Sequence, residues 1–157
     1  MRNAHDAIVN HARHHQLGGT PGTTCVAALV QDGRACWAHA GDSRAYLLRS
    51  GTVSAVTRDH SMVQQLVEEN IISQGEIKTH PDRNKITNCL GGIGELFYSE
   101  PSANMQLQSG DVLLLCSDGM WNPLDDKENS SSLSHFATGG NPESIDQRGG
   151  EPGRCAG

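Results

Sequence analysis

Hydrophobic residues form short runs separated by turn residues over the first 121 positions of the chain. Runs of this length, bounded by glycine, aspartate and serine, are typical of β-strands. Four of them follow one another, at residues 25–30, 35–40, 45–48 and 52–56. Asp32-Gly33 separates the first two runs and is a strong hairpin signal. We therefore expect an antiparallel meander over residues 24–57, with the strand at 25–30 buried on both faces.

Helical spacing of apolar residues predicts helices on either side of this meander. Residues 2–15 carry a narrow apolar stripe made of Ala4, Ile8, Val9 and Ala12. A second helix is expected to begin after Ser61, with the Ser61 side chain as its cap and Gln64 completing a capping box. A third, short helix is expected near Ser73.

Three later segments also have strand character, at residues 85–90, 103–107 and 113–116. Residues 103–107 alternate between apolar and polar, and Ser109-Gly110-Asp111 then turns the chain. We expect a hairpin here, whose second strand is a buried run that ends at Asp118.

Composition and charge exclude several classes of function. The 157 residues have a formal net charge of −6 and no block of lysine and arginine, which argues against a nucleic-acid partner. No apolar stretch reaches the roughly 20 residues of a membrane-spanning helix, which argues against a membrane partner. The five cysteines form no C-x-x-C pair. This spacing does not support a zinc site and favours reduced thiols in a cytoplasmic protein.

The sequence changes character after Glu128. Residues 129–157 contain six glycines and no hydrophobic periodicity, so we expect a disordered tail. The change is abrupt, as a shift of reading frame would make it, and the tail is therefore also interpreted as non-native. The predicted domain covers residues 1–128.

Two aspartates stand out as candidate chemistry. Asp42 and Asp118 each follow an apolar strand and have glycine and serine as neighbours. Two such carboxylates could converge on a hard cation, which prefers oxygen ligands. An aspartate at the end of a strand can equally cap the next helix, so the sequence leaves both roles open for Asp118.

Five segments, taken in order, resemble one family. They are Gly22-Thr23-Thr24, residues 38–47 (AHAGDSRAYL), residues 57–61 (TRDHS), residues 80–86 (HPDRNKI) and residues 110–121 (GDVLLLCSDGMW). In this order they are similar to the metal-dependent serine/threonine protein phosphatases of the 2C type, in their bacterial form. The resemblance implies an α+β fold, a partial α-β-β-α sandwich of two antiparallel sheets flanked by helices.

The resemblance also implies a mechanism and a set of site residues. A pair of Mn²⁺ or Mg²⁺ ions lowers the pKa of a water that attacks the phosphorus of phosphoserine or phosphothreonine. Asp118 is expected to bind that metal pair, and Asp42 a third, weaker ion. Residues 61–85 would form a flap beside the site, with Arg83 and Asn84 as possible substrate contacts. The substrates would be phosphorylated proteins, those of a serine/threonine kinase.

Other motifs of the family are not found in this sequence. They are an upstream arginine and acidic motif, an Asp-Gly-x-Gly segment, and an Asp-Asn pair after Asp118. No catalytic residue can therefore be assigned, and we expect this chain to be an incomplete and inactive fragment. One alternative is a non-catalytic pseudophosphatase or binding module. Another is a small all-β domain in which Asp42 and Asp118 are structural caps.

Four neighbouring residues have simpler expected roles. Arg44 is expected to pair with a carboxylate, and His60 to make a hydrogen bond at a helix start. Trp37 and Trp121 are expected in the core. For Asp59 the sequence leaves open a structural role and an indirect role beside a metal.

Overall fold

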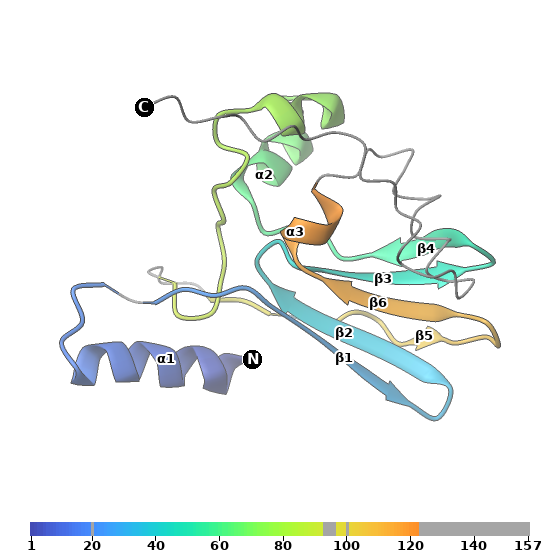
Figure 1. Ribbon diagram of the computed structural model, residues 1–157, viewed down its shortest axis with the longest axis horizontal. Helices are drawn as coiled ribbons and strands as arrows, with labels where there is room; N and C mark the ends of the chain where they lie inside the picture. Colours follow the sequence, from blue (N-terminus) through green and yellow to red (C-terminus); the bar gives the residue numbers. More distant parts are fainter. Residues whose placement is uncertain (20, 93–96, 100, 123–157) are drawn as a thin grey trace, which may run out of the picture.

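The computed structural model describes residues 1–19, 21–92, 97–99 and 101–122, which form two antiparallel sheets with helices outside them (Figure 1). The strand orders are β1-β2-β5 in one sheet and β4-β3-β6 in the other. The expected tail at 129–157 lies outside the described residues, so its disorder stays a prediction.

Each sheet is built around one tight hairpin. β1 (Cys25–Gln31) and β2 (Arg34–Ala40) pair along their whole length. Asp32 and Gly33 between them have φ values of 51° and 68°, the left-handed conformation that a two-residue hairpin turn requires. β3 (Arg44–Arg49) and β4 (Thr52–Val56) form the second hairpin. Both hairpins were predicted and are confirmed.

The predicted meander is wrong in one respect, because β2 does not pair with β3. The chain leaves the first sheet after Ala40 and enters the second at Arg44. Gly41, which is buried and has a φ of +103°, makes this change of direction. The two hairpins therefore lie in different sheets, and their apolar faces can pack against each other.

The hairpin predicted near Gly110 is also wrong. β5 (Met105–Gln106) pairs with β2, whereas β6 (Val112–Cys116) pairs with β3 in the other sheet. Among the described strands β6 lies at the edge of its sheet, and Leu115 is 44% exposed, so this strand is only partly buried. The segment 85–90 makes isolated bridges rather than the expected strand.

The main core lies between the two sheets. Trp37 from β2 packs against Ala45 and Leu47 from β3, and all three are buried. The next residues along β3, Tyr46 and Leu48, point to the opposite face and are buried too. β3 is therefore covered on both faces, which explains why its sequence is a continuous apolar run.

One helix packs against the outer side of each sheet. α1 (Arg2–His14) places Ile8 in a cluster with Ala40 and Leu90 on the first sheet. α3 (Asp118–Trp121) packs over Tyr46 and Leu48 of the second sheet. The layers follow the order helix, sheet, sheet, helix, which confirms the expected sandwich. Among the described residues, no helix is long and apolar enough to span a membrane.

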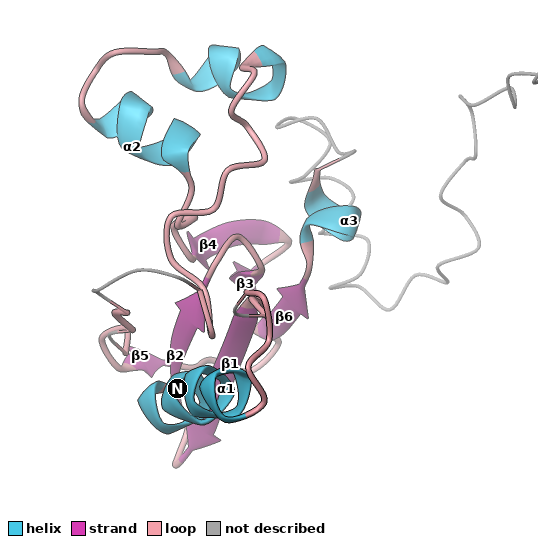
Figure 2. Cartoon of the chain, turned by 90° about the vertical axis from the view of Figure 1, so that its left-hand side faces the viewer, coloured by secondary structure: helices cyan, strands magenta, loops and turns pink. Residues whose placement is uncertain are grey.

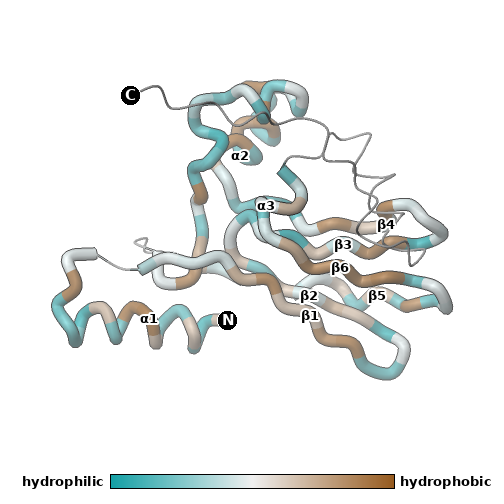
Figure 3. The backbone as a smooth tube through the Cα atoms, viewed as in Figure 1, coloured by the Kyte–Doolittle hydropathy of each residue, from teal (hydrophilic) through white to brown (hydrophobic). Residues whose placement is uncertain are grey.

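The far end of β1 departs from the expected burial. Leu29 and Val30 are 60% and 57% exposed, so β1 is not buried on both faces. In the described part of the chain β1 pairs only with β2, and no helix reaches this end of the hairpin. Figure 3 shows the hydrophobic stretch along β1.

The predicted flap, residues 61–85, contains α2 (Met62–Glu68) and the 3₁₀-helix η1 (Gln74–Thr79), which project beyond the ends of the strands (Figure 2). The Ser61 hydroxyl accepts a hydrogen bond from the Gln64 backbone at 3.3 Å, as expected of a cap. The Gln64 side chain, however, donates to Glu68, so the predicted capping box does not form there. A capping box forms instead at Ser73, at the start of η1.

Candidate metal site

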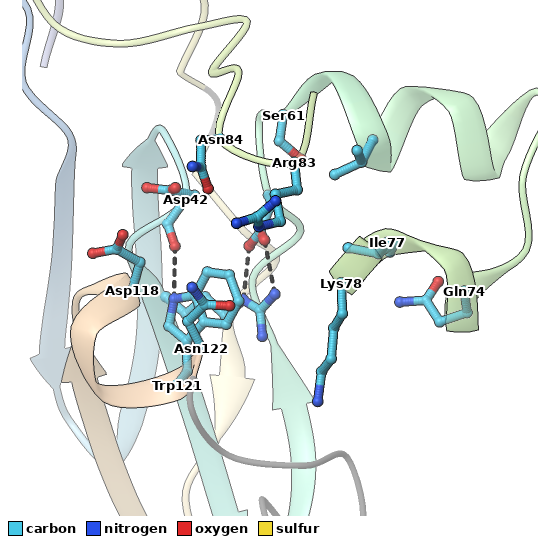
Figure 4. Close-up of a pocket in the computed structure, with 13 residues that line it drawn as sticks. Asp42, Ser61, Gln74, Ile77, Lys78, Arg83, Asn84, Asp118, Trp121 and Asn122 are labelled. Atoms are coloured by element: carbon cyan, nitrogen blue, oxygen red, sulfur yellow. Dashed lines mark hydrogen bonds and ion pairs between the residues drawn. The ribbon is translucent and has the colours of Figure 1, made fainter. Parts of the chain in front are cut away.

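The register of the second sheet brings the two candidate aspartates together. Arg44 of β3 pairs with Cys116 of β6 in an antiparallel ladder. The position two residues before Arg44 and the position two residues after Cys116 therefore lie at the same end of the sheet. These positions are Asp42 and Asp118, which line one pocket of about 100 Å³ (Figure 4).

The flap forms the other side of this pocket. Its lining residues from the flap are Ser61, Val63, Gln74, Ile77, Lys78, Arg83 and Asn84. The structure thus brings together all four residues that the sequence singled out for metal or substrate binding, namely Asp42, Asp118, Arg83 and Asn84. The pocket combines carboxylates from the sheets with an arginine and an amide from the flap.

Asp118 does not cap the helix that follows it. Ser117 is the N-cap of α3 and Asp118 is the first helical residue. One carboxylate oxygen, Oδ1, accepts a hydrogen bond of 2.8 Å from the Gly119 backbone N–H. This local bond holds the carboxylate at the pocket and leaves the second oxygen, Oδ2, available to a ligand.

The electrostatics of the pocket favour a bound cation. Burial raises the pKa of the Asp42 carboxyl, and the nearby negative charges of Asp118 and Asp59 raise it further, against the lowering effects of its own backbone N–H and of the Arg44 charge. A carboxylate whose charged form is disfavoured in this way gains from a positive ion beside it.

A cation–π contact that sequence analysis missed supports the base of the pocket. The Arg44 guanidinium lies 3.5 Å from the centre of the Trp121 ring. It also makes a bidentate ion pair with Asp59, with N–O distances of 2.8 and 2.7 Å. The expected pairing of Arg44 is thereby confirmed, and Asp59 has a structural role.

Trp121 is not a simple core residue, which corrects the expectation from sequence. It is partly exposed and lines the pocket. Its Nε1–H donates a hydrogen bond of 3.0 Å to the backbone oxygen of Asp42. Because Trp121 belongs to α3, this bond ties the helix that carries Asp118 to the loop that carries Asp42. Trp37, by contrast, is a core residue as predicted.

The described residues supply part of the ligand set that a metal ion needs. Carboxylates are the ligands that Mn²⁺ and Mg²⁺ prefer. Within residues 1–19, 21–92, 97–99 and 101–122, however, no group of three or more histidine, cysteine, aspartate or glutamate side chains is placed to hold an ion. Within these residues, Asp42 and Asp118 alone therefore make an incomplete ligand set, which water or further ligands would have to complete.

Comparisons with known proteins identify the family. Residues 1–74 match the model of protein phosphatase 2C. The serine/threonine protein phosphatase PstP of Mycobacterium tuberculosis is 41% identical over 107 residues, which are 68% of this chain and 20% of PstP. Protein phosphatase PhpP of Streptococcus pneumoniae is 35% identical over 131 residues, 80% of this chain and 52% of PhpP. The chain belongs to the protein phosphatase 2C family.

Solved structures of this family share the fold. The crystal structure of M. tuberculosis PstP superposes with a TM-score of 0.72 at 32% identity, covering 86% of this chain and 60% of that one. The PstP catalytic domain in complex with two manganese ions has a TM-score of 0.68 at 29% identity, covering 86% and 58%. The chain spans about half or less of the length of the curated relatives PhpP and PstP.

In this protein phosphatase 2C chain, His60 directly precedes Ser61, the N-cap of α2, and makes hydrogen bonds there as expected, although its partner is Gly41. Its ring stacks on His39 at 4.2 Å between centroids. Burial, together with the smaller effects of the charges of His39 and Arg58, lowers the pKa of His60 to about 4. The ring is therefore neutral at physiological pH.

The lowered pKa predicts an acid-sensitive stability. Since the folded state binds this proton less tightly than the unfolded state, the contribution of His60 is complete above pH 6.5 and is lost as pH falls towards about 4. We expect the stability advantage of the native chain over a His60→Asn variant to shrink by about 1 to 2 kcal/mol between pH 7.5 and 4.5. Urea unfolding of both proteins at the two pH values measures it, and a constant difference would contradict the prediction.

Proposed function

We propose that this chain is part of a metal-dependent protein serine/threonine phosphatase and that Asp42 and Asp118 are its metal-binding carboxylates. The observation that supports this most strongly is the convergence of the two carboxylates, from separate strand ends, on one pocket in which burial and neighbouring negative charge raise the pKa of Asp42. Bound Mn²⁺ or Mg²⁺ would supply a water of lowered pKa for attack on phosphorus.

The residues of this chain would position that ion and the substrate. Asp42 and Asp118 hold negative charge on the sheet side of the pocket. Arg83 presents a guanidinium from the flap, the group best suited to bind phosphate oxygens, and Asn84 adds an amide donor. The flap thus contributes to recognition of a phosphorylated serine or threonine on a protein substrate of a serine/threonine kinase.

We also propose a cellular setting for this chain. The four cysteines in the described part of the chain are free and partly buried, which supports a cytoplasmic location. Acidic net charge leaves phosphoproteins, not nucleic acids, as the proposed partners.

A second candidate is a non-catalytic pseudophosphatase. It is favoured by one observation, that the described residues offer only a partial ligand set for the ion. A single ion held by two carboxylates would bind weakly, because Mg²⁺ and Mn²⁺ need several oxygens placed together. For the same reason we expect the isolated chain to be inactive.

Hydrolysis of an aryl phosphate and of a phosphothreonine peptide tests this proposal. The 157-residue chain is assayed with Mn²⁺, with chelator and as an Asp118→Asn variant. We expect the native chain to hydrolyse neither substrate faster than the Asp118→Asn variant does, whether Mn²⁺ or chelator is present. Mn²⁺-dependent turnover that Asp118→Asn abolishes would support the phosphatase function and overturn the expected inactivity. Turnover that persists in chelator would contradict the metal-dependent mechanism.

A further inference from the structure

A histidine outside the pocket holds the peptide that carries Asp42. The His60 backbone N–H donates to the Gly41 oxygen at 3.0 Å. In return the Gly41 N–H donates to Nδ1 of the His60 ring at 3.3 Å. Both hydrogen-bonding groups of Gly41 are thus bound by one residue, 19 positions away in the sequence.

The His60 ring is itself held in place. The Asn88 side-chain amide donates to Nδ1 at 2.8 Å and to the backbone oxygen of Tyr98, also at 2.8 Å. The rings of His39 and Tyr98 lie 4.2 and 4.7 Å from that of His60, between centroids. Two donors aimed at Nδ1 require that this nitrogen carries no proton.

Gly41 needs this support because its conformation is unusual. Its φ of +103° lies outside the ordinary left-handed region, and the backbone after it changes sheet. On the pocket side, the Trp121 Nε1–H donates a hydrogen bond to the backbone oxygen of Asp42. Hydrogen bonds therefore hold the Gly41–Asp42 segment on both sides, from Trp121 on the pocket side and from His60 on the opposite side.

We propose that His60 is a positioning residue that fixes the orientation of the metal-binding carboxylate of Asp42 through the Gly41 peptide. This role rests on the proposed function, because it assumes that Asp42 binds the ion. His60 does not line the pocket of Asp42 and Asp118, and its effect passes through the Gly41 hydrogen bonds. The neutral ring that burial imposes is the form these bonds need.

Two substitutions at His60 distinguish the effect of the Nδ1 acceptor from the effect of side-chain volume. His60→Asn keeps an acceptor oxygen near the position of Nδ1, whereas His60→Leu keeps similar bulk and removes the acceptor. Val26→Ala is the matched control, because it destabilises the core between the sheets without touching Gly41.

The first readout needs no metal. Hydrogen exchange of the Gly41 amide, followed by NMR in the metal-free chain, should accelerate about tenfold in His60→Leu, as expected for the loss of one hydrogen bond. It should stay within about threefold of the native rate in His60→Asn. Unchanged Gly41 protection in His60→Leu would overturn the proposal.

The second readout is Mn²⁺ affinity, measured by electron paramagnetic resonance. We expect His60→Leu to weaken binding about tenfold and His60→Asn and Val26→Ala to leave it nearly unchanged. Equal loss in His60→Leu and Val26→Ala would mean a merely structural role and overturn the proposal. If the unsubstituted chain binds no Mn²⁺, the proposed function fails, while Gly41 exchange still decides whether His60 holds this peptide.

Discussion

Replacing Gly41 with alanine should destabilise the fold by about 3 kcal/mol. Two costs add up at this position. A φ of +103° is strained for any residue with a Cβ atom. That Cβ would also lie 2.4 Å from Cγ2 of Thr24, far inside van der Waals contact.

Gly18→Ala is the matched control for this substitution. Its Cβ would meet no atom within 4 Å. We expect the control to change stability by less than about 0.5 kcal/mol. Urea unfolding of the three proteins measures both effects, and a Gly41→Ala chain as stable as the control would show that the crossing between sheets is not fixed at Gly41.

Replacing Trp121 with alanine should cost about 2 kcal/mol, less than for a fully buried tryptophan because the side chain is partly exposed. The variant loses packing over Tyr46 and Leu48, the cation–π contact with Arg44, and the hydrogen bond to the Asp42 oxygen.

Trp121→Phe separates these contributions. It keeps an aromatic ring beside the Arg44 guanidinium, and it removes the Nε1–H donor together with a small part of the packing surface of the indole. We expect a loss of about 1 kcal/mol, together with weaker Mn²⁺ binding than in the native chain. Thermal unfolding and Mn²⁺ titration measure the two effects. Native Mn²⁺ affinity in both variants would show that α3 and the Asp42 loop are not coupled through Trp121.

The first two hairpins and the Ser61 cap could be predicted because local residues determine them. Asp32-Gly33 supplies the two left-handed residues of the first turn, and Ser61 caps α2 with its own hydroxyl. Such features depend on a few neighbouring positions, so the sequence pattern is sufficient.

The pairing of strands between sheets could not be predicted from the pattern. An apolar run such as residues 45–48 shows that a strand is buried but not which strand lies beside it. β5 and β6 are adjacent in the chain and yet join different sheets. The two-sheet arrangement was expected only from resemblance to a family.

The candidate site was predicted in part. Asp42 and Asp118 could be singled out because both follow strands, but their convergence depends on the register of β3 against β6. The roles of Trp121 and His60 depend on hydrogen bonds to the backbone of residues 41 and 42. A sequence pattern carries no signal for such contacts between distant segments.

Mn²⁺ binding to the 157-residue chain tests most directly whether Asp42 and Asp118 form one metal site. Electron paramagnetic resonance counts free Mn²⁺ in titrations of the native chain, Asp42→Asn, Asp118→Asn and the exposed control Asp6→Asn. We expect one weak site in the native chain and in Asp6→Asn, and a loss of at least about tenfold in affinity in each of the other two variants. Equal affinity in all four proteins, or no binding to the native chain, would contradict the assignment of the site.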